Sequence, residues 1–248
     1  MSNSIIFTYP KEIKNALDDV LPIPIKFNLP DWYKKLEHTR EFPTIKGCMP
    51  FLDTLTSGYL LKMPQDFFVE HNYDTDEGNK DSSFLFSFHR FTSAIHEKKI
   101  NLNTTVPEVH NSKQLGDSPL CEKNKNLNFY KILNPFKIKT PPGYSCLFVP
   151  PLNNHDDRFE IIPGIVDTDV FNRYVNFPIV INGDKYPNLK TVIKRGTPYV
   201  QIIPFKRDNW EHKVLIEKKN NFLSEALQNA KYFVNNYKRI WWNKKKWN

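Results

Sequence analysis

Several features are scarce in this sequence of 248 residues, and each scarcity excludes a class of protein. Only three cysteines are present, Cys48, Cys121 and Cys146, and no Cys-x-x-Cys pair exists, which argues against a zinc ribbon. Three distant cysteines predict free thiols in a reducing compartment and no disulfide. No window holds the roughly 18 apolar residues of a membrane span. The N-terminus has no basic segment leading into an apolar run, so a secretory signal is not expected.

Glycine is also scarce, at 8 residues, whereas proline is abundant, at 19. This combination favours long loops and edge strands over a helical bundle or a doubly wound parallel sheet. Short β runs separated by Pro and Gly turns recur through residues 129–206, for example at Tyr144–Val149 and Tyr199–Phe205. The sequence therefore predicts a mainly β fold, a compact β-sandwich or barrel.

The chain is expected to form a single domain, 1–248, in three parts. Residues 1–43 are a Pro-rich N-terminal segment, 44–206 the β core, and 221–248 a C-terminal helix with a basic aromatic tail. Short helical turns are predicted near the N-terminus, one of them capped by Asp31, and another over Pro50–Ser57. Their apolar anchors Trp32, Phe51 and Leu55 are predicted to be buried. One longer amphipathic helix is predicted over Asn221–Tyr237, whose apolar residues recur with a period of 3.6.

The formal net charge is +8, and its distribution is uneven. Residues 231–248 contain six basic residues and no acidic one, so this segment carries most of the excess. A nucleic-acid role for the body of the chain is therefore weakly supported, and any such role would belong to the tail.

Residues 140–206 resemble a known fold. Three segments carry the pattern, in this order along the chain. The first is a Pro-Gly turn and strand at Thr140-Pro141-Pro142-Gly143-Tyr144, and the second resembles a Gly-Val-Ile-Asp loop at Pro163 to Asp169. The third resembles a Gly-Asp-x-x-Ala-Gln strand at Ile193 to Ile203. This pattern is similar to the β-fold of trimeric dUTPases and dCTP deaminases, and it covers roughly a quarter of the chain. The resemblance implies a dUTPase-like β core and, by analogy of fold, a homotrimer.

The catalytic residues of that family transfer poorly to this chain. Asp167 falls where the family keeps the aspartate that orients the attacking water, but Val170 replaces the aromatic residue under the sugar. Pro151-Leu152 stands where an Arg-Ser pair contacts phosphate, and Gly196-Thr197-Pro198 replaces a Gly-Asp-Arg-like contact. A triphosphate needs several cationic or N–H donors and a metal ion. The resemblance therefore implies a shared fold without the activity.

The whole chain also resembles a family of uncharacterised proteins of marine tailed phages and related viruses. Trp32-Tyr33-Lys34-Lys35, residues 44–53, residues 163–169 and Pro204-Phe205-Lys206-Arg207 carry this resemblance. It implies no assigned activity, and it implies a viral setting in the cytoplasm of the host cell or in the virion.

Asp167 and Asp169 are the candidate catalytic residues, as a general base or a pair of metal ligands. The alternative is turn chemistry, because an aspartate after Pro-Gly accepts hydrogen bonds from backbone N–H groups. Tyr144 and Gln201, within the strands that carry the dUTPase-like pattern, are the candidate ligand-binding residues. No metal site and no cofactor are predicted, with Mg²⁺ required only if the chain handles nucleotides.

The C-terminal tail holds the candidate residues for binding nucleic acid or a partner: Arg239, Trp242, Lys244, Lys245, Lys246 and Trp247. In one account the tryptophans stack on bases while the cations neutralise phosphates. In the other account, which we favour, the tryptophans dock on the protein or on a partner subunit. Helical spacing from the preceding segment assigns Trp241 to the core and leaves Trp242 and Trp247 in question.

Three functions follow from these observations. The first is a non-catalytic viral accessory, binding or assembly protein built on a dUTPase-like β core. The second is a nucleotide-handling enzyme, similar to a dNTP hydrolase, that uses Asp167. The third is a nucleic-acid or membrane-surface binder that acts through its basic tail, with weak and strongly salt-dependent binding to nucleic acid.

Overall fold

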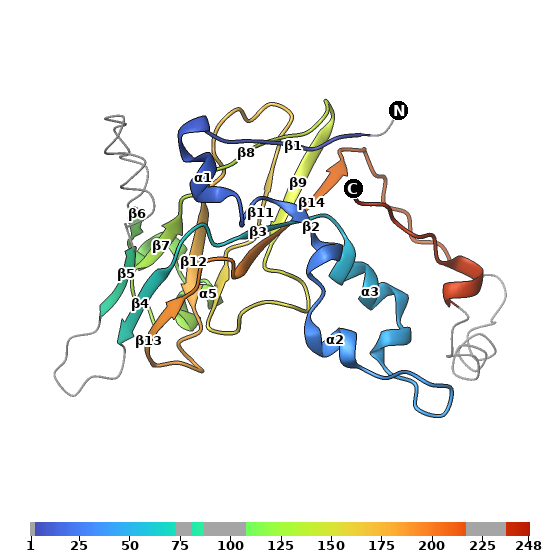
Figure 1. The fold of residues 1–248 in the computed structure, drawn as a ribbon, viewed down its shortest axis with the longest axis horizontal. Helices are drawn as coiled ribbons and strands as arrows, with labels where there is room; N and C mark the ends of the chain where they lie inside the picture. The colour runs from blue at the N-terminus through green and yellow to red at the C-terminus, as the bar shows by residue number, and fades with distance from the viewer. Residues whose placement is uncertain (1–2, 73–80, 87–107, 217–236) are drawn as a thin grey trace. The chain divides into compact units, whose positions relative to one another are not determined.

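The computed structural model describes residues 3–72, 81–86, 108–216 and 237–248. The chain divides into two compact units, which are described separately (Figure 1). Unit 1 comprises Met1–Ile23 and Gly58–Lys206, and unit 2 comprises Pro24–Ser57 and Arg207–Asn248. Unit 2 thus combines an early and a late segment of the chain, a division that differs from the three consecutive parts expected from the sequence. The single domain stays a prediction.

Unit 1 is built mainly of β-strands, as predicted, with a few short helices. Its helical elements are η1 (Lys11–Ile13), α1 (Lys14–Leu17), η4 (Ser112–Leu115) and α5 (Pro119–Lys123). Its strands are β1 (Ile6–Thr8), β3 (Tyr59–Lys62), β4 (Phe67–Asn72), β5 (Asp81–Phe86), β6 (Glu108–His110), β7 (Phe129–Ile132), β8 (Lys137–Lys139), β9 (Tyr144–Val149), β10 (Phe159–Ile161), β11 (Gly164–Val166), β12 (Phe177–Ile181), β13 (Asn188–Ile193) and β14 (Pro198–Lys206).

The strands of the described residues form four separate sheets and no closed barrel. The largest has the order β11-β9-β14-β3-β2, where β2 (Ile23–Pro24) lies at the point where the chain passes from unit 1 to unit 2. The others have the orders β10-β12-β7-β6, β13-β4-β5 and β1-β8. A mainly β fold is therefore confirmed, in the form of several sheets.

β9 and β14 are neighbouring inner strands of the largest sheet. β9 buries Ser145, Cys146 and Phe148, and β14 pairs with it in antiparallel register from Gln201 opposite Val149 to Lys206 opposite Tyr144. The turn before β9 places Gly143 at φ +82°, and the Tyr144 N–H donates to the Pro141 carbonyl. A Pro-Pro-Gly sequence suits such a turn, because glycine adopts positive φ without steric cost.

One hydrophobic cluster joins the sheets and α1 of unit 1. Phe67, Phe136, Phe148, Ile161 and Val200 are among its residues, and each is 2% exposed or less. Its members come from β3 and β4, and from most strands of residues 129–206, so strands far apart in the sequence share one core. Burial of aliphatic and aromatic side chains on this scale is the main stabilising contribution to such a fold.

Unit 2 is built from short helical elements around a small core. Its elements are η2 (Ile25–Asn28), α2 (Asp31–Lys35), η3 (Ile45–Gly47), α3 (Met49–Thr56) and the π-helical turn η5 (Tyr237–Trp241). The buried side chains are Ile25, Tyr33, Met49 and Leu55. α3 matches the helix predicted at Pro50–Ser57 to within one residue at each end. The predicted helix Asn221–Tyr237 lies outside the described residues, apart from Tyr237.

Two predictions about α2 are wrong. Asp31 does not cap the helix: Pro30 occupies the cap position, and the Asp31 carboxylate instead accepts a hydrogen bond from the Lys34 ammonium, at 3.0 Å. Trp32 is 48% exposed, although its ring contacts Tyr33 and Phe51 edge-on. The five-residue helix has room for one inward residue, and Tyr33 takes it. Leu55 is buried as predicted, and Phe51 is half-buried.

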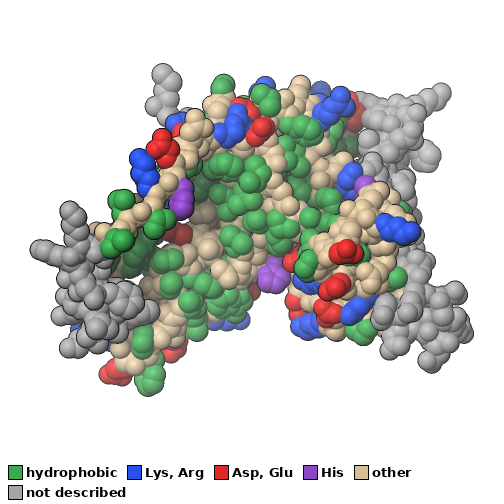
Figure 2. Space-filling model, turned by 180° about the vertical axis from the view of Figure 1, so that it is seen from behind, with side chains coloured by type: hydrophobic (Ala, Val, Ile, Leu, Met, Phe, Trp, Pro, Cys, Tyr) green, Lys and Arg blue, Asp and Glu red, His purple; other side chains and the backbone are tan. Residues whose placement is uncertain are grey.

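Two further findings concern the whole described chain. Cys48, Cys121 and Cys146 are all free thiols, in agreement with the prediction. Within the described ranges, no helix combines the length and the apolar character that crossing a bilayer requires. Hydrophobic side chains nevertheless reach the surface in several places on the face drawn in Figure 2.

Candidate functional sites

Asp167 and Asp169 lie in the turn that follows β11, and both carboxylates hold this turn in place. The Ser145 hydroxyl donates to Asp167 Oδ1 at 2.6 Å, and the Gly143 N–H donates to Asp169 Oδ2 at 2.8 Å. Asp167 is exposed and Asp169 is half-buried. The two carboxylates therefore join the turn to the start of β9, which is the turn chemistry that the sequence left as the alternative.

Thr168, between the two carboxylates, anchors the same turn from inside. It is 1% exposed, and its hydroxyl lies 2.7 Å from the Thr140 hydroxyl and 3.3 Å from the sulfur of Cys146, to which it donates. Burial raises the pKa of the Cys146 thiol to about 11, an effect that the hydrogen bond from Thr168 partly opposes. Ser145 and Thr140 were not singled out from the sequence, because nothing local marks them as partners of a turn more than 20 residues away.

Tyr144 and Gln201 are not brought together. Gln201 stands opposite Val149 in the register of β9 and β14, whereas Tyr144 is at the other end of β9. Five residues of strand separate the two positions by about 17 Å. Gln201 is fully buried, and its side-chain oxygen accepts a hydrogen bond from the Leu152 N–H at 2.8 Å. The Tyr144 hydroxyl accepts a hydrogen bond from Asn3. Gln201 thus fixes the loop after β9.

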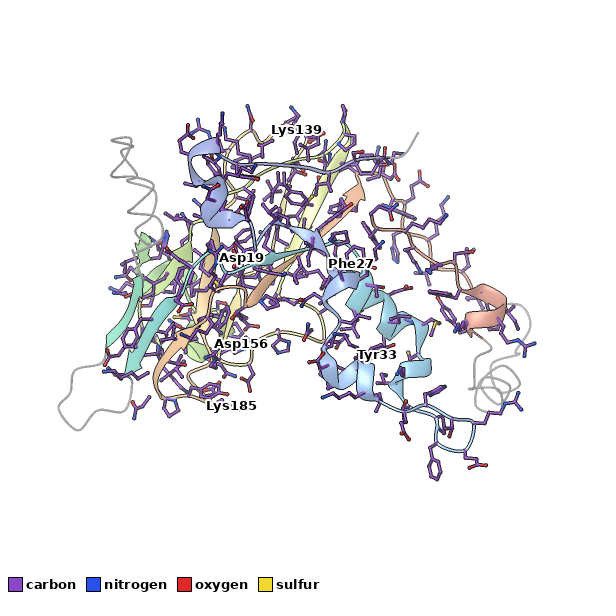
Figure 3. All side chains as sticks on the ribbon, in the orientation of Figure 1. Asp19, Phe27, Tyr33, Lys139, Asp156 and Lys185 are labelled. Carbon is purple, nitrogen blue, oxygen red and sulfur yellow. The ribbon has the colours of Figure 1, made fainter. Side chains whose placement is uncertain are left out.

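The basic residue nearest to the Gly196-Thr197-Pro198 loop is Arg195, and its guanidinium is taken up within unit 1. It pairs with Asp19, labelled in Figure 3, and donates to the backbone carbonyls of Ala16 and Pro64. Its side chain is only 13% exposed. The arginine therefore connects α1 to the loop before β14. A cation that binds phosphate must be accessible to it, whereas this guanidinium is occupied by contacts within the fold.

The described residues contain no group of three or more His, Cys, Asp or Glu side chains that could hold a metal ion. A cluster of opposite charges in unit 1 contains two ion pairs, between Arg158 and Asp156 at 2.6 Å and between Lys185 and Asp157. Asp156 and Lys185 lie at the same end of unit 1 in Figure 3. The Tyr186 hydroxyl also donates to Asp157, at 2.9 Å, so this cluster crosslinks two loops.

In unit 2, the C-terminal tail docks on α3 through one carboxylate. The Trp242 indole N–H donates to Asp53 Oδ2 at 3.1 Å, and the Lys245 ammonium donates to the same oxygen at 2.6 Å. The side chain of Asn248 accepts a hydrogen bond from Lys26, at 3.2 Å. Trp242 and Trp247 are half-buried. These contacts favour the docking account for Trp242, whereas docking of Trp247 stays a prediction.

The assignment of Trp241 to the core is wrong, since Trp241 is 60% exposed. The turn that carries it is a π-helical turn, in which the Trp242 N–H donates to the Tyr237 carbonyl at 2.8 Å. An i to i+5 bond holds more residues per turn than the 3.6 of an α-helix. The inward position therefore moves from Trp241 to Trp242. Arg239, Lys244, Lys245 and Lys246 are exposed.

Net positive charge and tryptophan are concentrated in unit 2. Unit 2 contains 15 of the 35 Lys and Arg residues but only 8 of the 27 Asp and Glu residues, so it carries +7 of the net +8. All five tryptophans belong to it. Its large exposed aromatic side chains include Phe27, Trp32, Phe42, Trp210 and Trp241, which are 48% to 90% exposed. This concentration of cations and aromatic side chains becomes visible only in the structure, which brings the two chain segments together in one unit.

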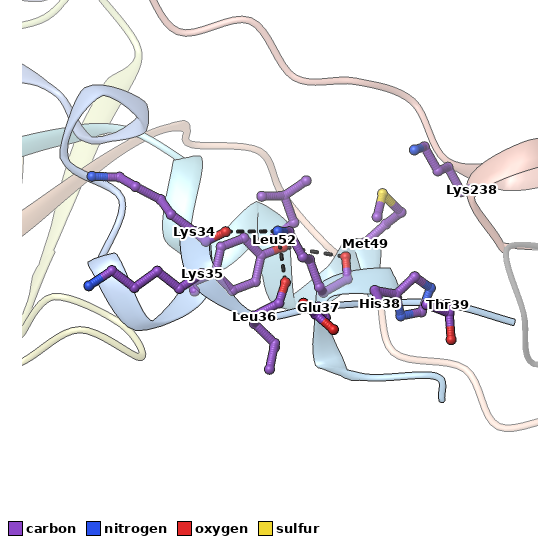
Figure 4. Close-up of a pocket in the computed structure, with 11 residues that line it drawn as sticks. Lys34, Lys35, Leu36, Glu37, His38, Thr39, Met49, Leu52 and Lys238 are labelled. Carbon is purple, nitrogen blue, oxygen red and sulfur yellow. Dashed lines mark hydrogen bonds between the residues drawn. The ribbon is translucent and has the colours of Figure 1, made fainter. Parts of the chain in front are cut away.

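An open groove of about 760 Å³ lies within unit 2, between the end of α2, the loop that follows, α3 and Lys238 (Figure 4). Leu36, Met49 and Leu52 give it an apolar wall. Four lysines line it against one acidic residue; the charged lining residues are Lys34, Lys35, Glu37, Lys46 and Lys238. The size is typical of a site for a small molecule.

Comparison with known proteins assigns no family: no protein-family model matches the chain, and no curated protein matches it.

Proposed function

We propose that the chain is a non-catalytic binding protein on a β scaffold, and that unit 2 binds single-stranded nucleic acid. The observation that carries this proposal is the composition of unit 2: a net charge of +7, all five tryptophans, and several aromatic side chains held at the surface. Cations that neutralise phosphates and aromatic faces that stack on bases are the two components of single-strand binding.

The exposed aromatics lie next to cations, as stacking sites require. The Lys26 ammonium lies 5.1 Å from the centre of the Phe27 ring, and Phe27 is 70% exposed. Trp241 directly follows Lys238, Arg239 and Ile240 in the exposed π-helical turn. Exposed apolar patches with a polar rim mark interaction surfaces. Base stacking would bury these rings without requiring any particular base sequence.

The arrangement in unit 1 supports the non-catalytic half of the proposal. Asp167 and Asp169 hold a turn through Ser145 and Gly143, and Arg195 is paired with Asp19. The resemblance to dUTPases and to viral proteins adds three further parts to the proposal. These parts are a dUTPase-like fold of residues 140–206, assembly into a homotrimer, and a role as a viral accessory protein in the host cytoplasm or the virion. Measurement of the mass in solution tests the trimer.

The test is binding of a labelled oligothymidylate, followed by fluorescence anisotropy over a series of salt concentrations. We expect the logarithm of the binding constant to fall linearly with the logarithm of the salt concentration, with a slope of about 0.7 per phosphate contacted. Trp241→Ala should weaken binding about fivefold or more, the value of one stacked base. Tyr174→Ala, which removes a half-exposed aromatic from unit 1, is the matched control and should change nothing.

Two other outcomes would replace the proposal. Equal or tighter binding to anionic lipid vesicles, with the same loss in Trp241→Ala, would identify a membrane surface as the partner instead. Turnover of a dNTP with Mg²⁺ that disappears in Asp167→Asn would show a nucleotide-handling enzyme and overturn the non-catalytic half.

A further inference from the structure

The groove of unit 2 contains a cation that pairs with no carboxylate of the described residues. The Lys46 ammonium donates to the Lys34 carbonyl at 2.9 Å and to the Leu36 carbonyl at 2.8 Å, which are carbonyls at the end of α2. An ammonium has three N–H donors, and within the described part of the chain these two neutral carbonyls are its only partners. Lys46 is half-buried, so its full positive charge and one donor remain at the groove.

The position of this ammonium is fixed before any ligand binds. Its two hydrogen bonds hold it against the C-terminal carbonyls of α2, and the carbonyl of Lys46 accepts a hydrogen bond from the Tyr33 hydroxyl at 3.4 Å. Tyr33 is 4% exposed and its ring stacks on Phe51, with 6.0 Å between the ring centres. A cation fixed in this way loses little conformational entropy when an anion binds to it.

The other lysines of the groove contribute unequally. Figure 4 shows the Lys34 and Lys35 side chains extending outward, to the other side from Lys238. The Lys34 ammonium is paired with Asp31. Lys238 is exposed and has no hydrogen-bond partner among the described residues. Lys46 and Lys238 are therefore the cations available to a ligand in the groove.

The rest of the lining suits a ligand with an anionic end and a larger, partly apolar body. Leu36, Met49 and Leu52 form the apolar wall, and Met49 is a flexible thioether that packs well on aromatic rings. Glu37 and Thr39 add a hydrogen-bond acceptor and a hydroxyl at the same groove. A bare inorganic anion would leave the apolar wall in contact with water.

We propose that this groove binds a nucleotide, with the phosphate on the Lys46 ammonium and the base against the wall of Met49 and Leu52. The nucleotide is either free or one unit of a nucleic-acid strand. In the second case the inference rests on the function proposed for unit 2. The chemistry recognised is the same for both sources: a phosphate ester attached to a flat heterocyclic body.

The experiment is isothermal titration calorimetry of the full chain with a deoxynucleoside monophosphate, the parent nucleoside and inorganic phosphate. The monophosphate should bind at least about tenfold more tightly than either fragment, because only it meets both the ammonium and the apolar wall. Lys46→Met should weaken its binding about tenfold or more, the effect of removing a hydrogen bond to a charged group. Equal binding of inorganic phosphate and the monophosphate would overturn the proposal.

Lys46 also stabilises the end of α2, so Lys46→Met could weaken binding by disturbing the fold. A second variant that leaves the fold intact is therefore needed. Lys238→Glu reverses an exposed charge that holds no part of the fold and should weaken binding roughly threefold. Lys139→Glu, the same change at an exposed position of β8, should leave binding unchanged. Unchanged affinity in both Lys46→Met and Lys238→Glu would overturn the groove as the binding site.

Titration of the oligothymidylate into the same variants separates this inference from the proposed function. Loss of strand binding in Trp241→Ala together with unchanged binding of both ligands in Lys46→Met would leave the proposed function standing and overturn the nucleotide groove. Binding of the monophosphate that depends on Lys46, without any strand binding by the wild type, would support the groove for a free nucleotide and overturn the proposed function.

Discussion

His71 lies on the inward face of a strand, at a position where the alternating pattern of burial favours an apolar residue. It follows Phe67 and Val69 on the inward face of β4, and it is fully buried. Burial, and to a smaller extent the nearby Lys125 charge, lower the pKa of the imidazole to about 4. The ring is therefore neutral in the folded protein near pH 7.

The depressed pKa predicts a loss of stability in mild acid. The unfolded chain takes up a proton near pH 6.5 and the folded chain only near pH 4, so the free energy of unfolding falls as the pH drops between these values. A difference of this size corresponds to about 3 kcal/mol. Urea unfolding at pH 7 and at pH 4.5 should show a smaller difference for His71→Gln than for the wild type. An unaltered pH dependence in His71→Gln, equal to that of the exposed-site control His155→Gln, would contradict the assignment.

A side chain at a glycine with positive φ can destabilise the fold in two ways, through backbone strain and through a steric clash, and a comparison of Gly58 with Gly143 distinguishes the two. Both have φ +82°, but a Cβ on Gly58 would lie 2.0 Å from the Ile202 carbonyl oxygen, whereas a Cβ on Gly143 would meet nothing within 4 Å. Gly143→Ala should cost about 1 kcal/mol of unfolding free energy from backbone strain alone. Gly58→Ala should cost more than about 2 kcal/mol, because the backbone of β14 must also move. Denaturant titration measures both, and equal losses would show that the contact with β14 relaxes freely.

At the scale of single residues, the sequence predicts burial well where a side chain belongs to a regular element. Leu55 is buried as its helical position indicates, whereas Trp32 is exposed because a helix of five residues has too short a face. Trp241 and Trp242 exchange roles because the turn is π-helical, and no local signal in the sequence distinguishes that turn from an α-helix. The turn-forming use of Asp167 was predictable as an alternative, but its partner Ser145 was not.

A carboxylate of α3, Asp53, connects the two chain segments of unit 2. Asp53 accepts hydrogen bonds from both the Trp242 indole and the Lys245 ammonium, and its side chain is 18% exposed. Partial burial makes this pair of contacts stronger than an ordinary surface ion pair, which contributes little. Asp53 is therefore one of the residues that hold the tail after η5.

Removal of that carboxylate should release the tail. Asp53→Ala is expected to weaken docking of the tail by about 1 to 2 kcal/mol. Trypsin should then cut at Lys244 to Lys246 roughly tenfold faster. Asp31→Ala removes an exposed carboxylate of the same unit that pairs only with Lys34, and it should leave the cleavage rate unchanged. Equal cleavage rates in the two variants would mean that other contacts hold the tail.

Whole elements were predictable where apolar runs and turn residues agree. β9 coincides with the predicted run Tyr144–Val149, and β14 contains the predicted Tyr199–Phe205, because both are apolar runs that begin after Gly-containing turns. The pairing of strands into several sheets was not predictable, since β4 pairs with β13 from more than 110 residues away. The groove was missed for the same reason: Lys238 meets α2 and α3 only through folding.

The division of the molecule places its hydrophobic cluster and its charge in different units. The cluster consists entirely of residues of unit 1, which is nearly neutral at +1, whereas unit 2 carries +7. Unit 2 has to be completed by its second segment, the last 42 residues of the chain. Its first segment therefore lacks its partner until the second segment has been synthesised.

Deletion of residues 207–248 should separate the contributions of the two units. The remaining chain loses ten basic and four acidic residues, so its formal charge falls from +8 to +2. We expect it to keep a cooperative thermal transition by circular dichroism, because the whole cluster is retained. It should lose retention on a heparin column at low salt. Absence of a cooperative transition would show that unit 1 depends on unit 2 for folding.

The segregation of the five tryptophans gives each unit its own optical signature. Unit 2 contains all of them, whereas unit 1 contains 8 of the 11 tyrosines, among them the fully buried Tyr199. Excitation at wavelengths that only indole absorbs therefore reports on unit 2 alone, while the sheet signal of circular dichroism comes mainly from unit 1. The unmodified protein thus carries two independent spectroscopic reporters, and the order in which its units lose structure can be read without attaching any label.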